Sequence, residues 1–214
     1  MSLVVQTLSE QIFTLVRDRI ISGSILPETP IRQDALAAEL GVSKIPLREA
    51  LARLEQEGLL VSHANRGFFV RPLSADEAEE VYALRLRLEP DAVGEACKVA
   101  AQADKAAARL ALKALDKAMV SNKEQVGGMN RAFHMSLVAP LGRPLTIQII
   151  ERLNVISERY VRKHLEPAGR DDRAHKEHLA MLELWADGKA SAVAGMMRDH
   201  IASTLEDLRR EFKN

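Results

Sequence analysis

Residues 41–60 read GVSKIPLREALARLEQEGLL, and the spacing within this stretch decides the fold of the N-terminal region. Four apolar residues recur at helical intervals and predict one buried stripe: Leu47, Ala50, Leu51 and Leu54. Pro46 falls in the first turn, where its missing N–H breaks no helical hydrogen bond. We therefore predict an amphipathic helix that is N-capped by Ser43 and ends at Gly58.

The opposite face of this helix carries cations that suit contact with DNA. Lys44 and Arg48 lie in its N-terminal half, the part of a recognition helix that enters the major groove, and Arg53 follows on the same helix. An arginine can bind guanine O6 and N7 with two hydrogen bonds, and Ser43 at the helix N-terminus suits a phosphate. Taken alone, however, such a helix is more often an ordinary surface helix. Its neighbours along the chain decide between the two interpretations.

The flanking segments follow the order of a winged helix-turn-helix. Five apolar residues predict one face of a first helix: Leu8, Ile12, Leu15, Val16 and Ile20. A second helix is predicted over residues 34–40 and ends at a glycine. After the quoted stretch, residues 59–70 contain two short apolar runs around a central AlaAsnArgGly turn, and they predict a β-hairpin.

The hairpin and the second helix add further DNA contacts to this prediction. Arg66 lies at the hairpin tip, and Gly67 gives the backbone the freedom that a tight turn needs. Such a wing would follow the DNA backbone or the minor groove. Arg32, which precedes the second helix, would contact a phosphate.

After residue 72 the sequence changes to helical periodicity throughout. Ser74 and Glu77 form the pattern of a capping box that begins a long helix. Loop signals separate six predicted helical segments: 75–101, 104–120, 124–139, 144–165, 171–186 and 189–212. We therefore expect a mainly α protein of two domains. Residues 1–72 form a winged helix-turn-helix of three helices plus a β-hairpin, and residues 73–214 form an all-α, six-helix antiparallel bundle.

The composition of the 214 residues limits the classes of function. Lys plus Arg number 30 and Asp plus Glu number 30, so the net charge is zero and only a local basic face could attract DNA. The single cysteine, Cys97, excludes an internal disulfide and a cysteine-rich metal site. No apolar run approaches about 18 residues, and no signal-peptide pattern is visible. We expect a cytoplasmic protein that does not contact a membrane.

Histidines on three predicted helices of the bundle form a second pattern. One asparagine and four histidines are informative: Asn130, His134, His175, His178 and His200. Apolar neighbours predict that these positions face the interior: Phe133, Leu137, Ile147, Leu179, Leu182, Met197 and Ile201. A divalent metal binds where imidazoles converge from different helices, yet a lone histidine on an apolar face is more often a hydrogen-bonded core residue. The spacing alone favours neither interpretation.

An enzyme is an alternative interpretation of the same histidines, because a metal with open water positions can activate water. The chain has no His-Glu-x-x-His, Gly-x-Ser-x-Gly or phosphate-loop pattern, however, and no general base stands out. Cys97 lies among Ala and Val on a predicted helix and is interpreted as a core residue. We therefore predict that the protein is not an enzyme.

The N-terminal residues resemble a known family. The run LAAELGVSKIPLREALARLEQEGLL, followed by NRGFFV, is similar to the GntR-type winged helix-turn-helix of bacterial transcription factors, and the resemblance covers residues 7–72. It implies a set of DNA-contacting positions: Ser43, Lys44, Arg48, Arg66 and Gly67. Lys44 and Ile45 stand where the family usually has Arg and Thr. Because Arg and Lys bind bases differently, two alternatives are open: the operator sequence departs from the common one, or Lys44 contacts only a phosphate.

Residues 74–212 resemble the FCD ligand-binding domain of the FadR-like branch of that family, and six helices suit its shorter, VanR-like subgroup. Four signatures match: LR and LEP within 84–90, N and FH within 130–134, EH at 177–178 and MRDH at 197–200. Position by position, the resemblance implies four ligands of a divalent metal, Zn or Ni: Asn130, His134, His178 and His200. Asn130 replaces the usual Asp, and its neutral amide predicts weaker metal binding. His175 has no counterpart in the signature.

The resemblance also implies that Arg85 faces an effector cavity, where a small carboxylate would bridge the metal and the guanidinium. The alternative is an intrahelical pair of Arg85 with Glu89 on a solvated surface. With the effector interpretation, the protein is a homodimeric regulator, more often a repressor, that binds an imperfect palindrome of double-stranded DNA. A sensor of the metal ion itself and a metal-dependent enzyme remain the alternatives.

Overall fold

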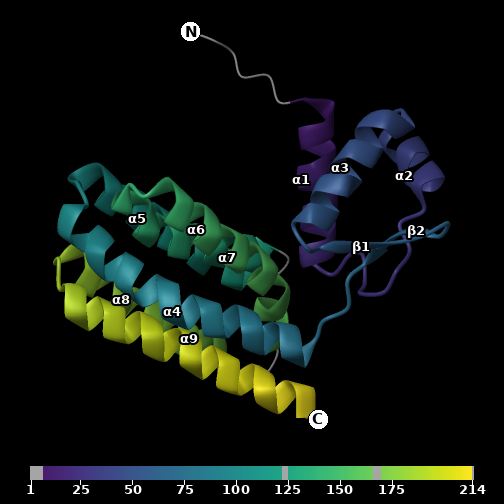
Figure 1. The fold of residues 1–214 in the computed structure, drawn as a ribbon. Helices are drawn as coiled ribbons and strands as arrows, with labels where there is room; N and C mark the ends of the chain where they lie inside the picture. Colours follow the sequence, from purple (N-terminus) through teal and green to yellow (C-terminus); the bar gives the residue numbers. More distant parts are fainter. Residues whose placement is uncertain (1–6, 122–124, 166–169, 214) are drawn as a thin grey trace, which may run out of the picture. The chain divides into compact units, whose positions relative to one another are not determined.

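The structure, a computed structural model, describes residues 7–121, 125–165 and 170–213. The chain forms two compact units, Met1–Pro72 and Leu73–Asn214 (Figure 1). Across the described ranges there are nine α-helices and one two-stranded sheet, so the predicted mainly α fold is confirmed. None of these helices is both long and apolar enough to cross a membrane.

The N-terminal unit consists of three helices and a β-hairpin: α1 (Leu8–Ile21), α2 (Gln33–Leu40), α3 (Lys44–Gln56), β1 (Leu60–His63) and β2 (Gly67–Val70). The two strands pair antiparallel. The four residues of the predicted α3 stripe are all fully buried, and α3 packs against α1. Burial of this stripe fixes which face of α3 stays accessible.

The predicted buried face of α1 is wrong at two positions. Leu8 and Leu15 are 49% and 39% exposed, whereas Phe13 is buried. Seven positions separate the two leucines, so they share one line along the helix, and this line lies at the edge of the buried stripe. The stripe is centred on the side of Phe13, because that side faces α3.

The C-terminal unit is the predicted bundle of six α-helices: α4 (Ala75–Val99), α5 (Gln102–Ser121), α6 (Val126–Val138), α7 (Pro144–Leu165), α8 (Arg170–Ala186) and α9 (Ala190–Lys213). A short 3-10 turn, η2 (Ala139–Leu141), precedes α7. Helices α4 and α9 lie side by side (Figure 1). A Cβ at Gly94 of α4 would lie 3.0 Å from the Ala190 carbonyl oxygen, so a glycine there permits the close approach.

The bundle core draws on all six helices, and its largest fully buried side chains are Tyr82, Phe133, Tyr160 and Trp185. Of the predicted inward residues, Leu179 is wrong, because it is 44% exposed. On α8 the buried stripe runs through His178 and Leu182, and Leu179 lies one position past its edge. Ile147 is half-buried.

The start of α4 differs in detail from the predicted capping box. Ser74 Oγ accepts a hydrogen bond from the Glu77 N–H at 3.3 Å, as expected of an N-cap. The Glu77 carboxylate, however, accepts a hydrogen bond from Tyr160 Oη at 2.6 Å, and the Ser74 N–H donates to the same Oη at 3.2 Å. A tyrosine of α7 thus takes the place of the reciprocal bond and ties the two helices together.

Candidate nucleic-acid interface and metal centre

An open groove of about 650 Å³ lies on the N-terminal unit between the start of α2, the start of α3 and the hairpin. It gathers five of the predicted DNA-contacting residues: Arg32, Lys44, Arg48, Arg66 and Gly67. We call this feature the basic groove. All four of its cationic side chains belong to exposed residues, so nothing in the unit covers the charges.

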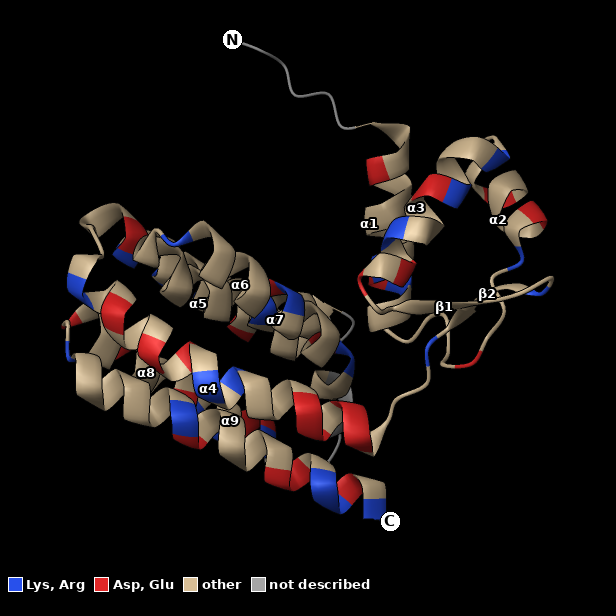
Figure 2. Cartoon of the chain, in the orientation of Figure 1, with Lys and Arg blue, Asp and Glu red and all other residues tan. Residues whose placement is uncertain are grey.

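The charge of the basic groove differs from that of the unit that contains it. The first 72 residues hold eight Lys or Arg and eight Asp or Glu. Four of those cations line the groove, whereas Asp34 is the single carboxylate on its lining. Figure 2 shows basic segments at the hairpin tip, at the start of α2 and on α3. A neutral unit therefore presents one locally basic surface, which is what attraction of a phosphate backbone requires.

Lys44 and Ser43, at the start of α3, differ in the contacts that their side chains make. Lys44 Nζ lies 2.6 Å from Asp34 Oδ1, and both side chains are largely exposed. Exposed ion pairs are weak, so Lys44 can exchange this carboxylate for a DNA group. Ser43 is the N-cap residue of α3 as predicted, but its side chain makes no capping hydrogen bond. Ser43 is not among the residues that line the groove.

Arg53 lies outside the basic groove. Its guanidinium carbon lies 4.5 Å from the centre of the Phe13 ring, which places the cation on an α1 side chain. Arg48 and Arg53 are five positions apart, so a helix of 3.6 residues per turn points them in different directions. The structure thus separates Arg53 from the other predicted DNA-contacting cations.

The hairpin tip supplies two groove residues that the sequence analysis did not single out. His63 and Asn65 are exposed and line the groove beside Arg66. Asn65 and Gly67 have φ angles of 61° and 82°, the left-handed conformation in which Asn and Gly are favoured. The Asn-x-Gly spacing at the turn was the sequence signal for this geometry.

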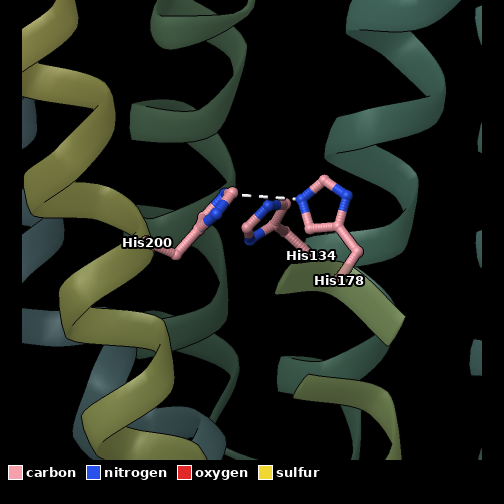
Figure 3. A group of neighbouring side chains, drawn as sticks. All are labelled: His134, His178 and His200. Carbon is pink, nitrogen blue, oxygen red and sulfur yellow. Dashed lines mark hydrogen bonds between the residues drawn. The ribbon is translucent and has the colours of Figure 1, made fainter. Parts of the chain in front are cut away.

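Three histidines converge in the C-terminal unit, one each from α6, α8 and α9: His134, His178 and His200 (Figure 3). All three are buried, and each offers a ring nitrogen within 4.8 Å of the other two. His178 Nε2 and His200 Nε2 are 3.3 Å apart. We call these residues the histidine cluster. His175 lies elsewhere, where its Nδ1 is 2.7 Å from Asp116 Oδ1.

The protonation and bonding of His134 fit a metal ligand. Burial, together with the neighbouring His200 and His178, holds the pKa of His134 well below its usual range, so the imidazole is neutral. Neither ring nitrogen of His134 has a hydrogen-bond partner among the described residues. A buried polar group in that state is costly unless a further group binds it. Three buried imidazoles around one point form a donor set that a divalent cation accepts.

A carboxylate positions one member of the histidine cluster. Glu177 Oε2 lies 2.6 Å from His200 Nδ1, so Nδ1 carries the proton and Nε2 keeps its lone pair toward the other rings. Arg173 Nε lies 3.5 Å from the other carboxylate oxygen of Glu177, and Arg173 also pairs with Asp207. Glu177 belongs to the EH signature at 177–178, but no role was predicted for it from the sequence. Its neighbour His178 marks it as a helix position close to the cluster.

The histidine cluster borders a cavity of about 20 Å³, large enough for one ion or one water molecule. All four predicted ligands and Arg85 line it, so the structure brings together the residues that the sequence analysis proposed. Two polar residues that were not proposed also line it, Tyr82 and Thr204. Apolar side chains such as Leu115 and Met119 complete the wall.

Arg85 combines features of both earlier interpretations. It pairs with Glu89 on the same helix, through Nε to Oε1 at 2.6 Å and Nη2 to Oε2 at 3.1 Å. The pair is not on a solvated surface, however, because Arg85 is 3% and Glu89 0% exposed. Two residues of α7 hold the pair in place. Ser157 Oγ accepts a hydrogen bond from Arg85 Nη1, and Asn154 Nδ2 donates one to Glu89 Oε1. Arg85 is therefore a fixed, buried cation at the cavity wall.

Comparison with known proteins gives matches in both units of the chain. Residues 8–70 match the family described as bacterial regulatory proteins, gntR family, and residues 80–203 match the FCD domain. The Nta operon transcriptional regulator of Aminobacter aminovorans is 32% identical over 188 residues, 88% of either chain. The HTH-type transcriptional repressor GlaR of Escherichia coli (strain K12) is 24% identical over 199 residues, 89% of this chain and 90% of its own. The solved structure of E. coli McbR/YncC has a TM-score of 0.84 at 21% identity, covering 97% of this chain and 100% of that one.

Proposed function

Because the chain belongs to the gntR family of bacterial transcriptional regulators and carries an FCD domain, we propose that it is a ligand-responsive repressor. The family and the relatives are regulators rather than enzymes. In this proposal a homodimer binds an operator, and a small carboxylate held through a divalent metal changes that binding. The observation that carries the proposal is the convergence of three buried histidines on a cavity that Arg85 also lines.

The DNA-binding part of the proposal rests on the basic groove. The buried stripe of α3 leaves Lys44 and Arg48 on the accessible face, where Arg48 can reach a base edge in the major groove. Arg66 on the hairpin then reaches the adjacent backbone or minor groove, and Arg32 a phosphate. A homodimer has two such heads related by a two-fold axis, so the operator is an imperfect palindrome.

The ligand-binding part rests on the histidine cluster and the cavity. His134, His178 and His200 would hold the metal, Zn or Ni, through neutral nitrogens, with the Asn130 amide oxygen as a weaker fourth ligand. The bound metal supplies an electrophilic position for one carboxylate oxygen of the effector. Arg85 offers a cation at the cavity wall for the same anion.

Coupling to DNA binding follows from where the cavity residues lie along the chain. Arg85 belongs to α4, which begins at Ala75, directly after the residues that join the two units. A displacement of α4 in response to the effector therefore reaches the junction through continuous helix. Regulation requires that the effector bind one arrangement of the two DNA-binding heads better than the other. We propose that effector binding lowers the affinity for the operator and releases the protein from it. This direction agrees with the relative that is named a repressor.

The experiment that tests DNA recognition compares two arginines of one helix. A duplex selected from a randomised pool serves as operator, and affinity is measured by fluorescence anisotropy at two salt concentrations. Arg48→Ala is expected to weaken binding by about 1–3 kcal/mol, because it removes a base contact. Arg53→Ala is the matched control and is expected to leave the affinity within about twofold of wild type, because Arg53 stacks on Phe13. Equal losses in both variants would contradict the assignment of the groove.

The proposed ligand set has its own test, which does not depend on DNA. The double variant His178→Ala/His200→Ala removes two of the three imidazoles and is expected to lose its metal content by elemental analysis. The matched control is His175→Ala, because His175 pairs with Asp116 away from the cluster. Stoichiometric metal retained in the double variant would refute the ligand set.

A further inference from the structure

Tyr82 is a buried polar residue of the bundle whose hydroxyl is not satisfied. The side chain is fully buried in α4, and no described residue forms a hydrogen bond of regular geometry with Oη. Arg85 is close, with its guanidinium carbon 5.1 Å from the ring centroid, but a guanidinium carries only donors and so gives the phenolic proton no acceptor. An unpartnered buried hydroxyl destabilises a fold, and native proteins keep such groups where a further molecule satisfies them.

The position of Tyr82 shows where that further molecule would lie. Tyr82 lines the cavity beside the histidine cluster, and Arg85, three residues later, lines the same cavity from the same face of α4. His134 lines this cavity as well, together with His178 and His200. A group bound between the metal ligands and Arg85 therefore lies beside the Tyr82 side chain as well.

The ionisation of Tyr82 sets the kind of partner that its hydroxyl accepts. Burial raises the pKa of Tyr82 to about 12, although the nearby Arg85 acts in the opposite direction. The phenol therefore keeps its proton at neutral pH and acts as a hydrogen-bond donor. The complementary group is an oxygen with free lone pairs, and an anionic oxygen such as that of a carboxylate makes the stronger hydrogen bond.

We propose that the Tyr82 hydroxyl is a further ligand-binding group of the cavity and donates a hydrogen bond to a carboxylate oxygen of the effector. This inference rests on the proposed function, because it assumes that the cavity takes an organic anion. Tyr82 then serves specificity as well as affinity. A ligand without an acceptor at this point would leave the hydroxyl unpaired in a buried place, and such sites discriminate strongly against it.

The chain contains two tyrosines, and the second provides a matched control. Tyr160 is also fully buried, but its hydroxyl bonds Glu77 and Ser74, and Tyr160 is not among the residues that line the cavity. Tyr160→Phe therefore removes satisfied hydrogen bonds, whereas Tyr82→Phe removes an unsatisfied hydroxyl. In the metal-free protein we expect the Tm to fall by about 2–4 °C in Tyr160→Phe and to stay unchanged or rise in Tyr82→Phe.

Ligand binding gives the opposite order of effects. Acetate, lactate and malonate serve as probes with zinc-loaded protein, and the one that raises the wild-type Tm most is used for isothermal titration calorimetry. Tyr82→Phe is expected to bind this probe about ten- to a hundredfold more weakly, the usual effect of losing a hydrogen bond to a charged group. Tyr160→Phe is expected to bind it as the wild type does.

The outcomes separate this inference from the proposed function. If the wild type binds a probe and Tyr82→Phe binds it equally well, Tyr82 is not a ligand-binding group, while the carboxylate effector stands. If Tyr82→Phe lowers the Tm of the metal-free protein as Tyr160→Phe does, the hydroxyl has a structural role and the inference is overturned. If no probe stabilises the zinc-loaded wild type, the carboxylate part of the proposed function fails and this inference fails with it.

Discussion

Replacing Glu177 by glutamine tests whether a carboxylate outside the ligand set controls metal binding. In the structure Glu177 Oε2 accepts from His200 Nδ1 at 2.6 Å, a short bond of the kind that an ionised acceptor makes. The substitution Glu177→Gln keeps an oxygen acceptor of nearly the same shape and removes the charge. We therefore expect the fold to persist and the basicity of His200 Nε2 to fall.

The size of this effect follows from the surroundings of Glu177. Loss of a hydrogen-bonded group behind a metal ligand commonly weakens metal affinity by about ten- to a hundredfold. Two features of the site favour the lower end of that range. Arg173 lies 3.5 Å from the other oxygen of Glu177 and offsets part of its charge, and the Glu177 side chain is 24% exposed, so solvent screens a further part. We expect about a tenfold loss, close to 1.4 kcal/mol.

The assay is competition for zinc between the protein and a chromophoric chelator, with thermal unfolding of the metal-free variants measured alongside. Glu183→Gln is the matched control, because Glu183 is an exposed residue of the same helix and is absent from the cavity lining. A zinc affinity of Glu177→Gln within twofold of wild type would refute the positioning role. An equal loss in Glu183→Gln would show instead that only the overall charge matters.

Three further predictions concern the core, the groove and pH. Leu51→Ala removes a fully buried side chain of the α3 stripe and is expected to lower the free energy of unfolding of the N-terminal unit by about 2–5 kcal/mol in urea titrations; a loss below about 1 kcal/mol would contradict the packing described for α3. Asp34→Asn removes the single carboxylate that lines the basic groove and frees Lys44, so binding to a non-operator duplex should tighten by about two- to fivefold in anisotropy measurements. Unchanged or weaker binding would contradict the assignment of this groove as the surface that meets the phosphates. The pKa of His134 is lowered in the folded protein, so below about pH 6.5 the unfolded chain binds a proton that the folded chain does not. The free energy of unfolding of the chelator-treated protein should therefore be constant above that pH and decline below it, by at most about 1.4 kcal/mol per pH unit for this residue. If the free energy of unfolding of a His134→Gln variant falls with pH as steeply as that of the wild type, His134 is excluded as the cause.

The fold was predictable from the sequence wherever the signal is local. The α3 stripe, the hairpin turn and the helix ends of the bundle depend on periodicity and on Gly and Pro stops, which a single segment carries. The errors at Leu8, Leu15 and Leu179 lie at the edges of correctly predicted helices. Whether a residue at the edge of a buried stripe is covered depends on where the neighbouring helix lies. The sequence of the segment itself does not contain that information.

The same distinction applies to the functional residues. Arg48 and Arg53 look alike in the sequence, and only the position of Phe13 on another helix separates them. Spacing alone left the histidines undecided, and the resemblance to the family supplied the set that the structure brings together. Tyr82 and Glu177 could not be identified from the sequence. Tyr82 stands out because its buried hydroxyl lacks a hydrogen bond, and Glu177 stands out because it contacts His200 across the α8–α9 interface.

The dimensions of the cavity bear on the choice between a sensor of the metal ion and a receptor for an organic acid. A volume of about 20 Å³ admits an ion between histidines that already converge, so metal binding requires little rearrangement. A ligand shifts a conformational equilibrium only by its difference in affinity for the two states. An organic acid exceeds that volume and requires the cavity to widen, so its affinity can differ between two conformational states more than that of the ion does. We therefore expect zinc alone to leave operator affinity within about twofold of the metal-free value, and zinc with a bound carboxylate to change it by about five- to 150-fold, the usual range of coupling between sites. A full release of the operator by zinc alone, in the absence of any carboxylate, would reverse this assignment and identify the ion as the signal.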